Sequence, residues 1–256
     1  MKVATIQLSV VENDKDATLK KASIAIKQCS DADLIILPEI WNIGFMSFDR
    51  YVSEAEDVNG PTMTMLKTLA QQIGAFLHTG SFVEKENDQY FNTSFLLSPD
   101  GEILAKYRKL HLFGYNSEES QLLTSGEAPV VVKTPFGSIG MATCFDLRFP
   151  ELFRAMVDMG AQIFLVSSAW PYPRIEPWIM FNRVRALENQ SFLISANSAG
   201  INRGIQFAGH SMVVDPWGTV VAGAGDEEGI VQTQIDPQKV QQAREAFPAL
   251  AGRRAF

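Results

Sequence analysis

The sequence contains very little cysteine and histidine. Only two cysteines, Cys29 and Cys144, and three histidines occur among its 256 residues. The cysteines lack the C-x-x-C spacing of a zinc site, and the histidines lack the i, i+4 spacing of a helical metal site. We therefore predict no metal centre and no disulfide framework, and we expect the chain to work in the reducing cytoplasm.

The sequence also lacks an excess of positive charge and any long apolar run. Its 22 basic residues are scattered and face 29 acidic ones, which gives a net charge of −7. This balance disfavours nucleic acid and anionic membranes as partners. No apolar run approaches the length of a membrane span, and residues 1–11 are too polar for a secretory signal, so we expect neither segment.

No linker, low-complexity tract or short repeat interrupts the chain, so we predict a single domain over residues 1–256. Strands and helices alternate, and many strands are apolar throughout, which indicates sheets covered by helices in an α/β fold. Periodicity alone leaves a doubly wound sheet and a layered sandwich open. The expected strands are 2–10, 34–37, 76–83, 90–97, 102–108, 130–142 (broken by a turn at 135–137), 163–167, 192–196, 211–214, 219–222 and 229–235, and the expected helices are 15–28, 61–73, 177–189, 237–247 and one from Pro150.

Three residues of complementary chemistry stand at or just past the ends of apolar strands. They are Glu39, Lys109 and Cys144. A thiol is a strong nucleophile once a base removes its proton, and a carboxylate in a dry pocket can be that base. A lysine ammonium could stabilise the oxyanion that such an attack creates. The alternative is three unrelated side chains: a buried thiol, a surface carboxylate and a surface ammonium.

Cys144 is predicted to lie at a turn from a strand into a helix. Such a turn exposes the side chain at the sheet edge and directs backbone N–H groups, including that of Phe145, toward the group under attack. A helix N-terminus also favours the thiolate over the thiol.

Five segments in the same order resemble the nitrilase superfamily of carbon–nitrogen hydrolases, and they cover essentially the whole chain. They are L-P-E at 37–39, Y-R-K-L-H-L-F at 107–113, G-M-A-T-C-F-D-L-R-F-P-E at 140–151, the W-P…W…R-x-R-A-x-E-N…N pattern at 170–197, and G-H-S with D-P-W-G at 209–218. The F-D-L-R-F-P-E and H-L-F runs resemble the omega-amidase branch. Residues 114–116, Gly-Tyr-Asn, depart from the Asp-Ile/Val-Asp type of run that is more usual there.

The resemblance implies a four-layer αββα sandwich that assembles as a homodimer or larger homo-oligomer and needs no cofactor. It implies a triad in which Glu39 is the base, Lys109 the oxyanion donor and Cys144 the nucleophile that forms a thioester. A further glutamate supports the triad, and Glu119 fits better than Glu118 because it keeps the relatives' spacing to Gly126. The backbone N–H of Phe145 is the second oxyanion donor.

The resemblance further implies an amidase that hydrolyses a small linear carboxamide to carboxylate and ammonia, such as a dicarboxylate monoamide. An Arg fork suits a substrate carboxylate, so we predict that Arg174 binds one. Trp41, Tyr115 and Trp170, with Phe45, are predicted to line the pocket. Asp146 and Arg148 are expected to brace the turn at Cys144 instead. The alternatives are an N-carbamoyl amide hydrolase and a non-catalytic interaction scaffold of the same fold.

Overall fold

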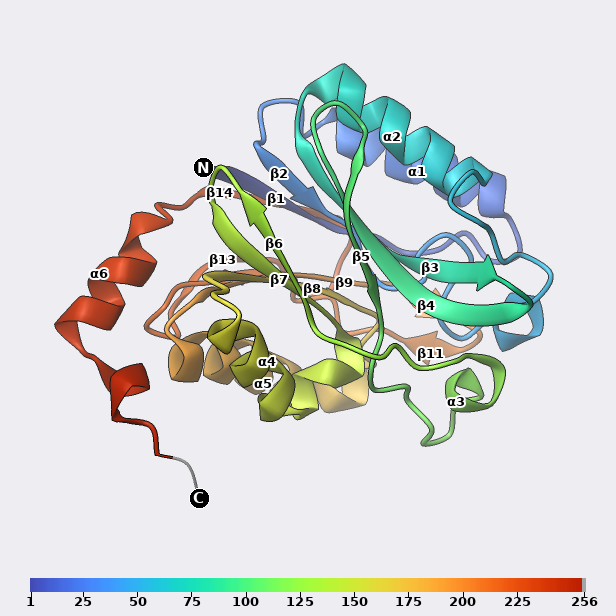
Figure 1. The fold of residues 1–256 in the computed structure, drawn as a ribbon. Coiled ribbons are helices and arrows are strands. Elements are labelled where there is room, and N and C mark those ends of the chain that lie inside the picture. The colour runs from blue at the N-terminus through green and yellow to red at the C-terminus, as the bar shows by residue number, and fades with distance from the viewer. Residues whose placement is uncertain (255–256) are drawn as a thin grey trace.

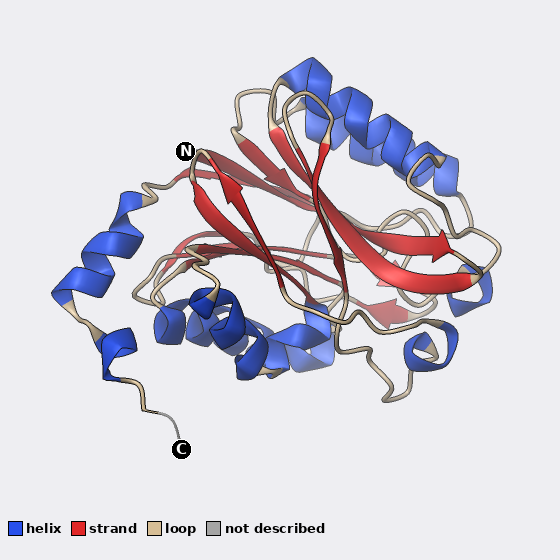
Figure 2. Cartoon of the chain, viewed as in Figure 1, coloured by secondary structure: helices blue, strands red, loops and turns tan. Residues whose placement is uncertain are grey.

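The computed structural model describes residues 1–254 as two sheets that pack face to face, with helices on both outer faces. The helix–sheet–sheet–helix order is plain in Figure 2, where two groups of helices enclose two layers of strands. This is the αββα sandwich that the resemblance implied, and the doubly wound alternative is wrong.

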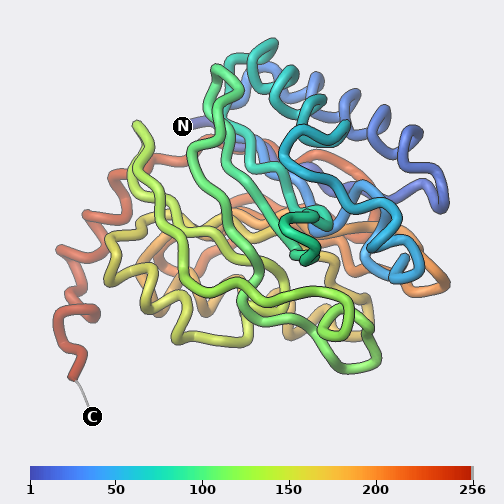
Figure 3. The backbone as a smooth tube through the Cα atoms, turned by 45° about the vertical axis from the view of Figure 1, so that its right-hand side comes forward, coloured from blue at the N-terminus to red at the C-terminus, as the bar shows by residue number. Residues whose placement is uncertain are grey.

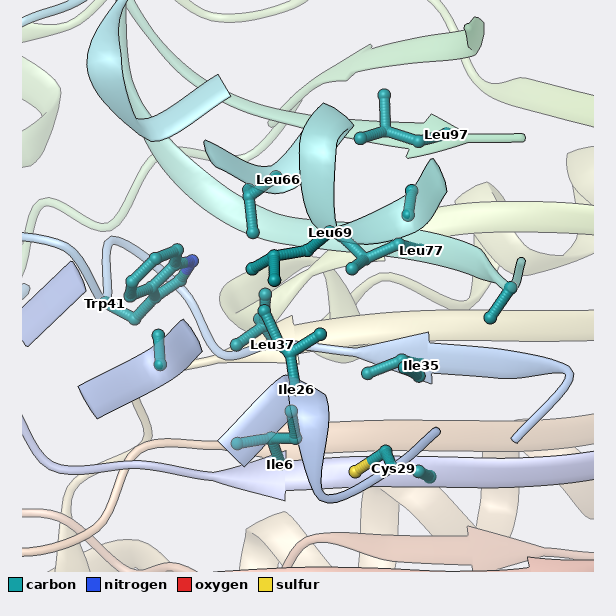
Figure 4. Close-up of a cluster of buried hydrophobic side chains, with 14 of the residues drawn as sticks. Ile6, Ile26, Cys29, Ile35, Leu37, Trp41, Leu66, Leu69, Leu77 and Leu97 are labelled. Atoms are coloured by element: carbon teal, nitrogen blue, oxygen red, sulfur yellow. The ribbon is translucent and has the colours of Figure 1, made fainter. Parts of the chain in front are cut away.

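The first sheet has the strand order β14-β1-β2-β3-β4-β5. β1, β2 and β3 are parallel, and the other neighbours pair in antiparallel fashion. The elements are β1 (Lys2–Gln7), β2 (Leu34–Ile36), β3 (Phe76–Glu86), β4 (Gln89–Leu97), β5 (Ile103–Arg108) and β14 (Gly229–Gln234), with the covering helices α1 (Lys15–Lys27) and α2 (Pro61–Ile73). Apolar side chains such as Ile26, Leu66 and Leu69 join these helices to the strands in one buried cluster (Figure 4).

The second sheet has the strand order β13-β12-β9-β8-β7-β6, with β7, β8 and β9 parallel. Its elements are β6 (Val130–Thr134), β7 (Gly137–Thr143), β8 (Ile163–Ser168), β9 (Phe192–Asn197), β12 (Met212–Val214) and β13 (Val220–Gly223), with the covering helices α4 (Pro150–Asp158) and α5 (Ile175–Asn189). Trp178 and Phe153 bury fully between these helices and the strands. The closing helix α6 (Gln238–Ala246) lies at the opposite end of the molecule from the short helix α3 (Glu119–Leu122) in both views (Figures 1 and 3).

Two short elements near Lys109 and Cys144 were not predicted. The segment after Lys109, for which no helix or strand was predicted, contains the helical turn α3, which the buried Glu119 begins. A two-stranded hairpin joins β10 (Ile201–Asn202) to β11 (Ile205–Gln206). Its turn residues Arg203 and Gly204 both have positive φ, and the Asn-Arg-Gly sequence was a readable turn signal.

No helix within residues 1–254 combines the length and the apolar character that a membrane crossing requires.

A buried histidine lies on β3, the strand that pairs with β2 and β4. His78 is fully buried, and its Nε2 has no hydrogen-bond partner among the described residues. Because burial disfavours the charged imidazolium, it lowers the pKa of His78 to about 3. The folded protein therefore keeps this ring neutral at pH values at which an unfolded chain protonates it.

His78 predicts acid sensitivity of the fold. Well above pH 6.5 the ring is neutral in both states and contributes no pH dependence. Below pH 6.5 the unfolded chain binds a proton that the folded chain does not bind, so stability falls by up to about 1.4 kcal/mol per pH unit until about pH 3. We expect urea unfolding at pH 5 to show a loss of about 2 kcal/mol relative to pH 8 that disappears in His78→Leu. Equal pH dependence in both proteins would refute this role.

Candidate active site

The ends of strands from both sheets bring the predicted residues together. Glu39 follows β2, Lys109 follows β5 directly, and Cys144 follows β7 directly. Lys109 Nζ lies 2.7 Å from Glu39 Oε1, and both side chains are fully buried. The strand beside β7 carries Ala169 just after its end, and the backbone N–H of Ala169 donates to Glu39 Oε2 at 2.9 Å. The Glu39 carboxylate, which follows a strand of the first sheet, thus lies against the strand ends of the second sheet.

Local backbone geometry fixes Glu39. Pro38 ends the apolar strand β2, and its carbonyl accepts the Ser81 N–H at 3.0 Å. Gly80 makes this approach possible, because its φ is +64° and a Cβ there would lie 2.1 Å from the Pro38 oxygen. The Glu39 N–H donates to the Ser168 carbonyl at 3.2 Å. The carboxylate therefore projects from a backbone held by both sheets.

Glu119 completes the buried charge cluster. Lys109 Nζ donates to both Glu119 carboxylate oxygens at 2.9 Å, and the Phe113 N–H donates to Oε2 at 2.7 Å. Glu119 is fully buried, whereas Glu118 is exposed. Of the two candidate glutamates, Glu119 is the one in contact with Lys109.

Asn92 on β4 belongs to the same cluster and was missed from the sequence. Its amide Nδ2 donates to Glu39 Oε1 at 2.9 Å and to Glu119 Oε1 at 2.7 Å. Its backbone carbonyl accepts the backbone N–H of Lys109 at 2.9 Å. No distinct sequence signal marks it, because Asn92 stands beside the polar Thr93 and Ser94 in the same strand.

Cys144 occupies a sharp turn between β7 and the short 3₁₀ helix η2 (Cys144–Arg148). Its φ is +47°, a left-handed conformation that a residue with a side chain adopts at a cost of order 1 kcal/mol. Thr143 and Asp146 cap the turn reciprocally, side chain to backbone. Asp146 also accepts from the Tyr107 hydroxyl at 2.6 Å and contacts His111 Nδ1 at 2.7 Å. Asp146 therefore braces the cysteine turn, as predicted from the sequence.

The electrostatics of the site keep the thiol protonated at rest. Burial raises the pKa of the Cys144 thiol, and the Glu39 carboxylate raises it further, while Lys109 lowers it in part. Burial and the Glu39 charge thus oppose the expected preference of a helix N-terminus for the thiolate. Burial lowers the pKa of Lys109, but the charges of Glu119 and Glu39 outweigh it and hold that pKa above its usual range. The ammonium stays charged, and attack by the sulfur requires a base.

A cavity of about 430 Å³ opens at Cys144. Tyr115, Trp170 and Arg174, predicted to bind substrate, all line it, and so does Phe45. The prediction for Trp41 is wrong, because this side chain is 2% exposed and packs into the cluster under α1 and α2 (Figure 4). Its indole N–H donates to the Thr79 carbonyl. The sequence of the aromatic-rich loop at residues 40–51 does not show which of its rings point into the core.

Two further parts of the cavity wall were not predicted. The hairpin contributes residues 204–206, and η2 contributes Arg148, which was expected only to brace the turn. The Arg148 guanidinium lies 5.3 Å from the Trp170 ring, and Arg174 lies 5.3 Å from the Phe113 ring. Neither arginine forms an ion pair with another residue of 1–254.

No cluster of His, Cys, Asp and Glu within the described chain is arranged to hold a metal ion. The groups gathered around Cys144 include the buried Lys109 ammonium, the Glu39 carboxylate and the backbone N–H groups at the start of η2. The arrangement of thiol, carboxylate and ammonium suits acyl transfer to sulfur.

Comparison with known families identifies the family to which this chain belongs. The carbon-nitrogen hydrolase family matches residues 2–245. The chain belongs to the carbon-nitrogen hydrolase family. It is an amidase-type hydrolase of the omega-amidase-like branch of the nitrilase superfamily.

Its relatives among the carbon-nitrogen hydrolases are similar along nearly the whole chain. The 2-oxoglutaramate amidase of Paenarthrobacter nicotinovorans is 36% identical over 88% of this chain and 79% of its own. The 2-oxoglutaramate amidase of Bacillus subtilis is 34% identical over 96% of this chain and 95% of its own. Nit3 of Saccharomyces cerevisiae, a member of branch 10 of the nitrilase superfamily, has a solved structure that superposes with a TM-score of 0.91, at 33% identity over 100% of this chain and 97% of that one.

Proposed function

We propose that this carbon-nitrogen hydrolase is a cysteine-dependent amidase that cleaves the terminal amide of a short dicarboxylate monoamide. The observation that carries the proposal is the cavity wall, in which the thiol of Cys144 shares one space with the guanidinium groups of Arg148 and Arg174. A thiol beside unpaired cations suits a substrate with an amide at one end and a carboxylate at the other. The relatives named 2-oxoglutaramate amidase support the same substrate class.

In the first half of the proposed reaction, Glu39 removes the proton of the Cys144 thiol and the sulfur attacks the amide carbon. The carbonyl π electrons move to oxygen, and the oxyanion accepts hydrogen bonds from Lys109 and from the Phe145 N–H. Phe145 is the second residue of η2, where backbone N–H groups have no partner inside the helix. Glu39 then returns its proton to the amide nitrogen, the carbon–nitrogen bond breaks, and ammonia leaves a thioester.

In the second half, Glu39 removes a proton from water, and the resulting hydroxide attacks the thioester carbon. The tetrahedral oxyanion again uses the Lys109 and Phe145 donors. When it collapses, the carbon–sulfur bond breaks, the sulfur regains a proton from Glu39, and the carboxylic acid product leaves. Glu119 supports this cycle by holding the Lys109 ammonium from two oxygens, which fixes it beside Glu39.

A panel of substrates tests the proposal. Ammonia release is measured from 2-oxoglutaramate, its one-carbon-shorter homologue, glutamine, butyramide, an N-carbamoyl amino acid and a simple nitrile. We expect the keto-acid monoamides to be the best substrates. A preference for the N-carbamoyl compound would establish the alternative hydrolase. No turnover of any compound would reject the amidase proposal.

Arg174 is predicted to select for the substrate's carboxylate. A charge-assisted hydrogen bond contributes about 1.5–3 kcal/mol, so Arg174→Ala should raise KM for 2-oxoglutaramate about 10- to 100-fold. The same variant should change KM for butyramide, which has no carboxylate, less than about threefold. Unchanged KM for both amides would remove Arg174 from the binding site, and Arg148→Ala, measured alongside, shows which cation dominates.

We also propose that the single domain of residues 1–256 assembles as a homodimer or larger homo-oligomer. An exposed apolar patch beside α5 supports this, since Met180 and Leu187 are 60% and 49% exposed and line one surface groove together with Trp217, which is 51% exposed. Light scattering should give at least twice the monomer mass, and Met180→Glu with Leu187→Glu should lower it. A monomeric wild-type protein would reject the proposal.

We further propose that the protein works in the cytoplasm. Both Cys29 and Cys144 are free and buried. A reducing compartment keeps such thiols available, and the proposed nucleophile must stay reduced. Cell fractionation with an antibody against the protein tests this placement.

A further inference from the structure

Two carboxylates in the buried cluster share one lysine and one amide. Glu39 Oε1 and Glu119 Oε1 each accept a hydrogen bond from Lys109 Nζ and another from Asn92 Nδ2. The four groups therefore close a ring in which the two donors alternate with the two acceptors. All four side chains are at most 1% exposed.

The ring carries two potential negative charges and a single fixed positive charge. Desolvation raises the pKa of Glu119, Lys109 lowers it, and the Glu39 charge raises it. Asn92 is the only neutral group of the ring, and its two N–H bonds point at one oxygen of each carboxylate. An amide supplies these two donors without adding charge, which neither an aspartate nor a hydroxyl could do.

The orientation of the Asn92 amide satisfies the two carboxylates but leaves its own carbonyl oxygen without a partner. Its Oδ1 has no hydrogen-bond partner among residues 1–254. The flipped amide would set this oxygen against two carboxylate oxygens. An unsatisfied buried acceptor costs about 1–3 kcal/mol, so the residue is poorly explained by fold stability alone.

Asn92 also controls the backbone of Lys109. The ladder between β4 and β5 pairs Thr93 with Arg108, so Asn92 and Lys109 are the next residues along the two strands. The Asn92 carbonyl accepts the Lys109 N–H at 2.9 Å. One residue therefore holds the lysine by its main chain and both glutamates by its side chain.

We propose that Asn92 is a positioning residue for the reaction: its side-chain N–H₂ anchors Oε1 of Glu39. Oε2 accepts only one hydrogen bond in the described chain, from the Ala169 N–H, and so keeps a lone pair for proton exchange with Cys144. Asn92 does not line the cavity, so it acts through Glu39 and not on the substrate. This inference rests on the proposed function, because it assigns Asn92 to the base of that mechanism.

The test compares Asn92→Leu and Asn92→Asp with Ser94→Ala. Both Asn92 variants keep the approximate size of the side chain and lose its N–H₂. Ser94 is a matched control, because it lies two residues along β4, is buried, and has a hydroxyl without a hydrogen-bond partner in the described chain.

For both Asn92 variants we expect kcat for 2-oxoglutaramate to fall about 10- to 100-fold, with KM changed less than about threefold. The acid limb of the pH profile of kcat/KM should move to higher pH, because a carboxylate that loses N–H donors holds its proton to a higher pH. Ser94→Ala should keep the wild-type pH profile. A folded Asn92→Leu protein with wild-type kcat and acid limb would overturn the proposal.

A second measurement does not depend on any substrate. Alkylation of Cys144 by iodoacetamide also requires the base to remove the thiol proton. The rate of alkylation should fall in both Asn92 variants, and the acid limb of its pH profile should move to higher pH, as for kcat/KM. An inactive wild-type protein would therefore reject the proposed function alone, while unchanged alkylation in the Asn92 variants would reject the positioning role alone.

Discussion

Cys144→Ala is expected to lower kcat/KM for 2-oxoglutaramate by about 10⁴-fold or more, to the limit of detection. The sulfur forms the covalent bond of the proposed thioester, and neither Glu39 nor Lys109 can replace it as a nucleophile. The substitution should leave the fold intact, because it removes one sulfur from a position that lines a cavity. Ammonia release and circular dichroism on the same sample measure both properties.

Cys29→Ala is the matched control for this prediction. Cys29 is also a free buried thiol, but it lies in the cluster under α1, away from the cavity. Burial raises its pKa to about 11, and its Sγ donates to the Ala25 backbone carbonyl at 3.3 Å, whereas Cys144 contacts the Glu39 carboxylate. The control should retain wild-type kcat/KM. Residual turnover in Cys144→Ala within tenfold of wild type would contradict the thioester mechanism.

Lys109→Met should cost both activity and stability. The lysine is fully buried between Glu39 and Glu119, so its loss leaves two carboxylates without their cation. Breaking a buried ion pair by removing one partner destabilises proteins by about 3–5 kcal/mol. For a chain of this length that corresponds to a Tm lower by about 10 °C. Amide hydrolysis should also fall by at least about 10³-fold, because the oxyanion loses its charged donor.

A second substitution separates the two effects of Lys109→Met. The double variant with Glu119→Gln removes one of the two unpaired carboxylates, so it should regain several degrees of Tm. It should not regain activity, because no cation returns to the oxyanion. Calorimetry and ammonia release distinguish these results. A Lys109→Met protein as stable as wild type would show that the buried carboxylates are neutral without the lysine.

The layers of the fold were largely predictable from the sequence. Continuous apolar runs such as β8 indicated strands buried on both faces, and the helices from Pro61 and Pro150 began where proline favours a first turn. Periodicity could not show how the sheets stack, because a strand buried on both faces has the same apolar pattern whether helices or a second sheet cover it. The motif resemblance supplied that step.

The site was predictable where chemistry coincides with a strand end. Glu39, Lys109 and Cys144 stand there as polar residues after apolar runs, so their residue types alone suggested a reaction. Asn92 escaped because it lies inside a strand, where a buried amide gives no signal until its partners are known. The error for Trp41 has a similar cause, since the direction of a side chain in an irregular loop depends on tertiary contacts.

The most direct test of the central claim is titration of the protein with iodoacetamide while ammonia release is followed. We expect one equivalent of label to enter Cys144 before Cys29, activity to fall in proportion to this label, and 2-oxoglutaramate to slow both the labelling and the loss of activity. Full activity after Cys144 is alkylated, or inactivation that follows Cys29 instead, would contradict the assignment of Cys144 as the nucleophile.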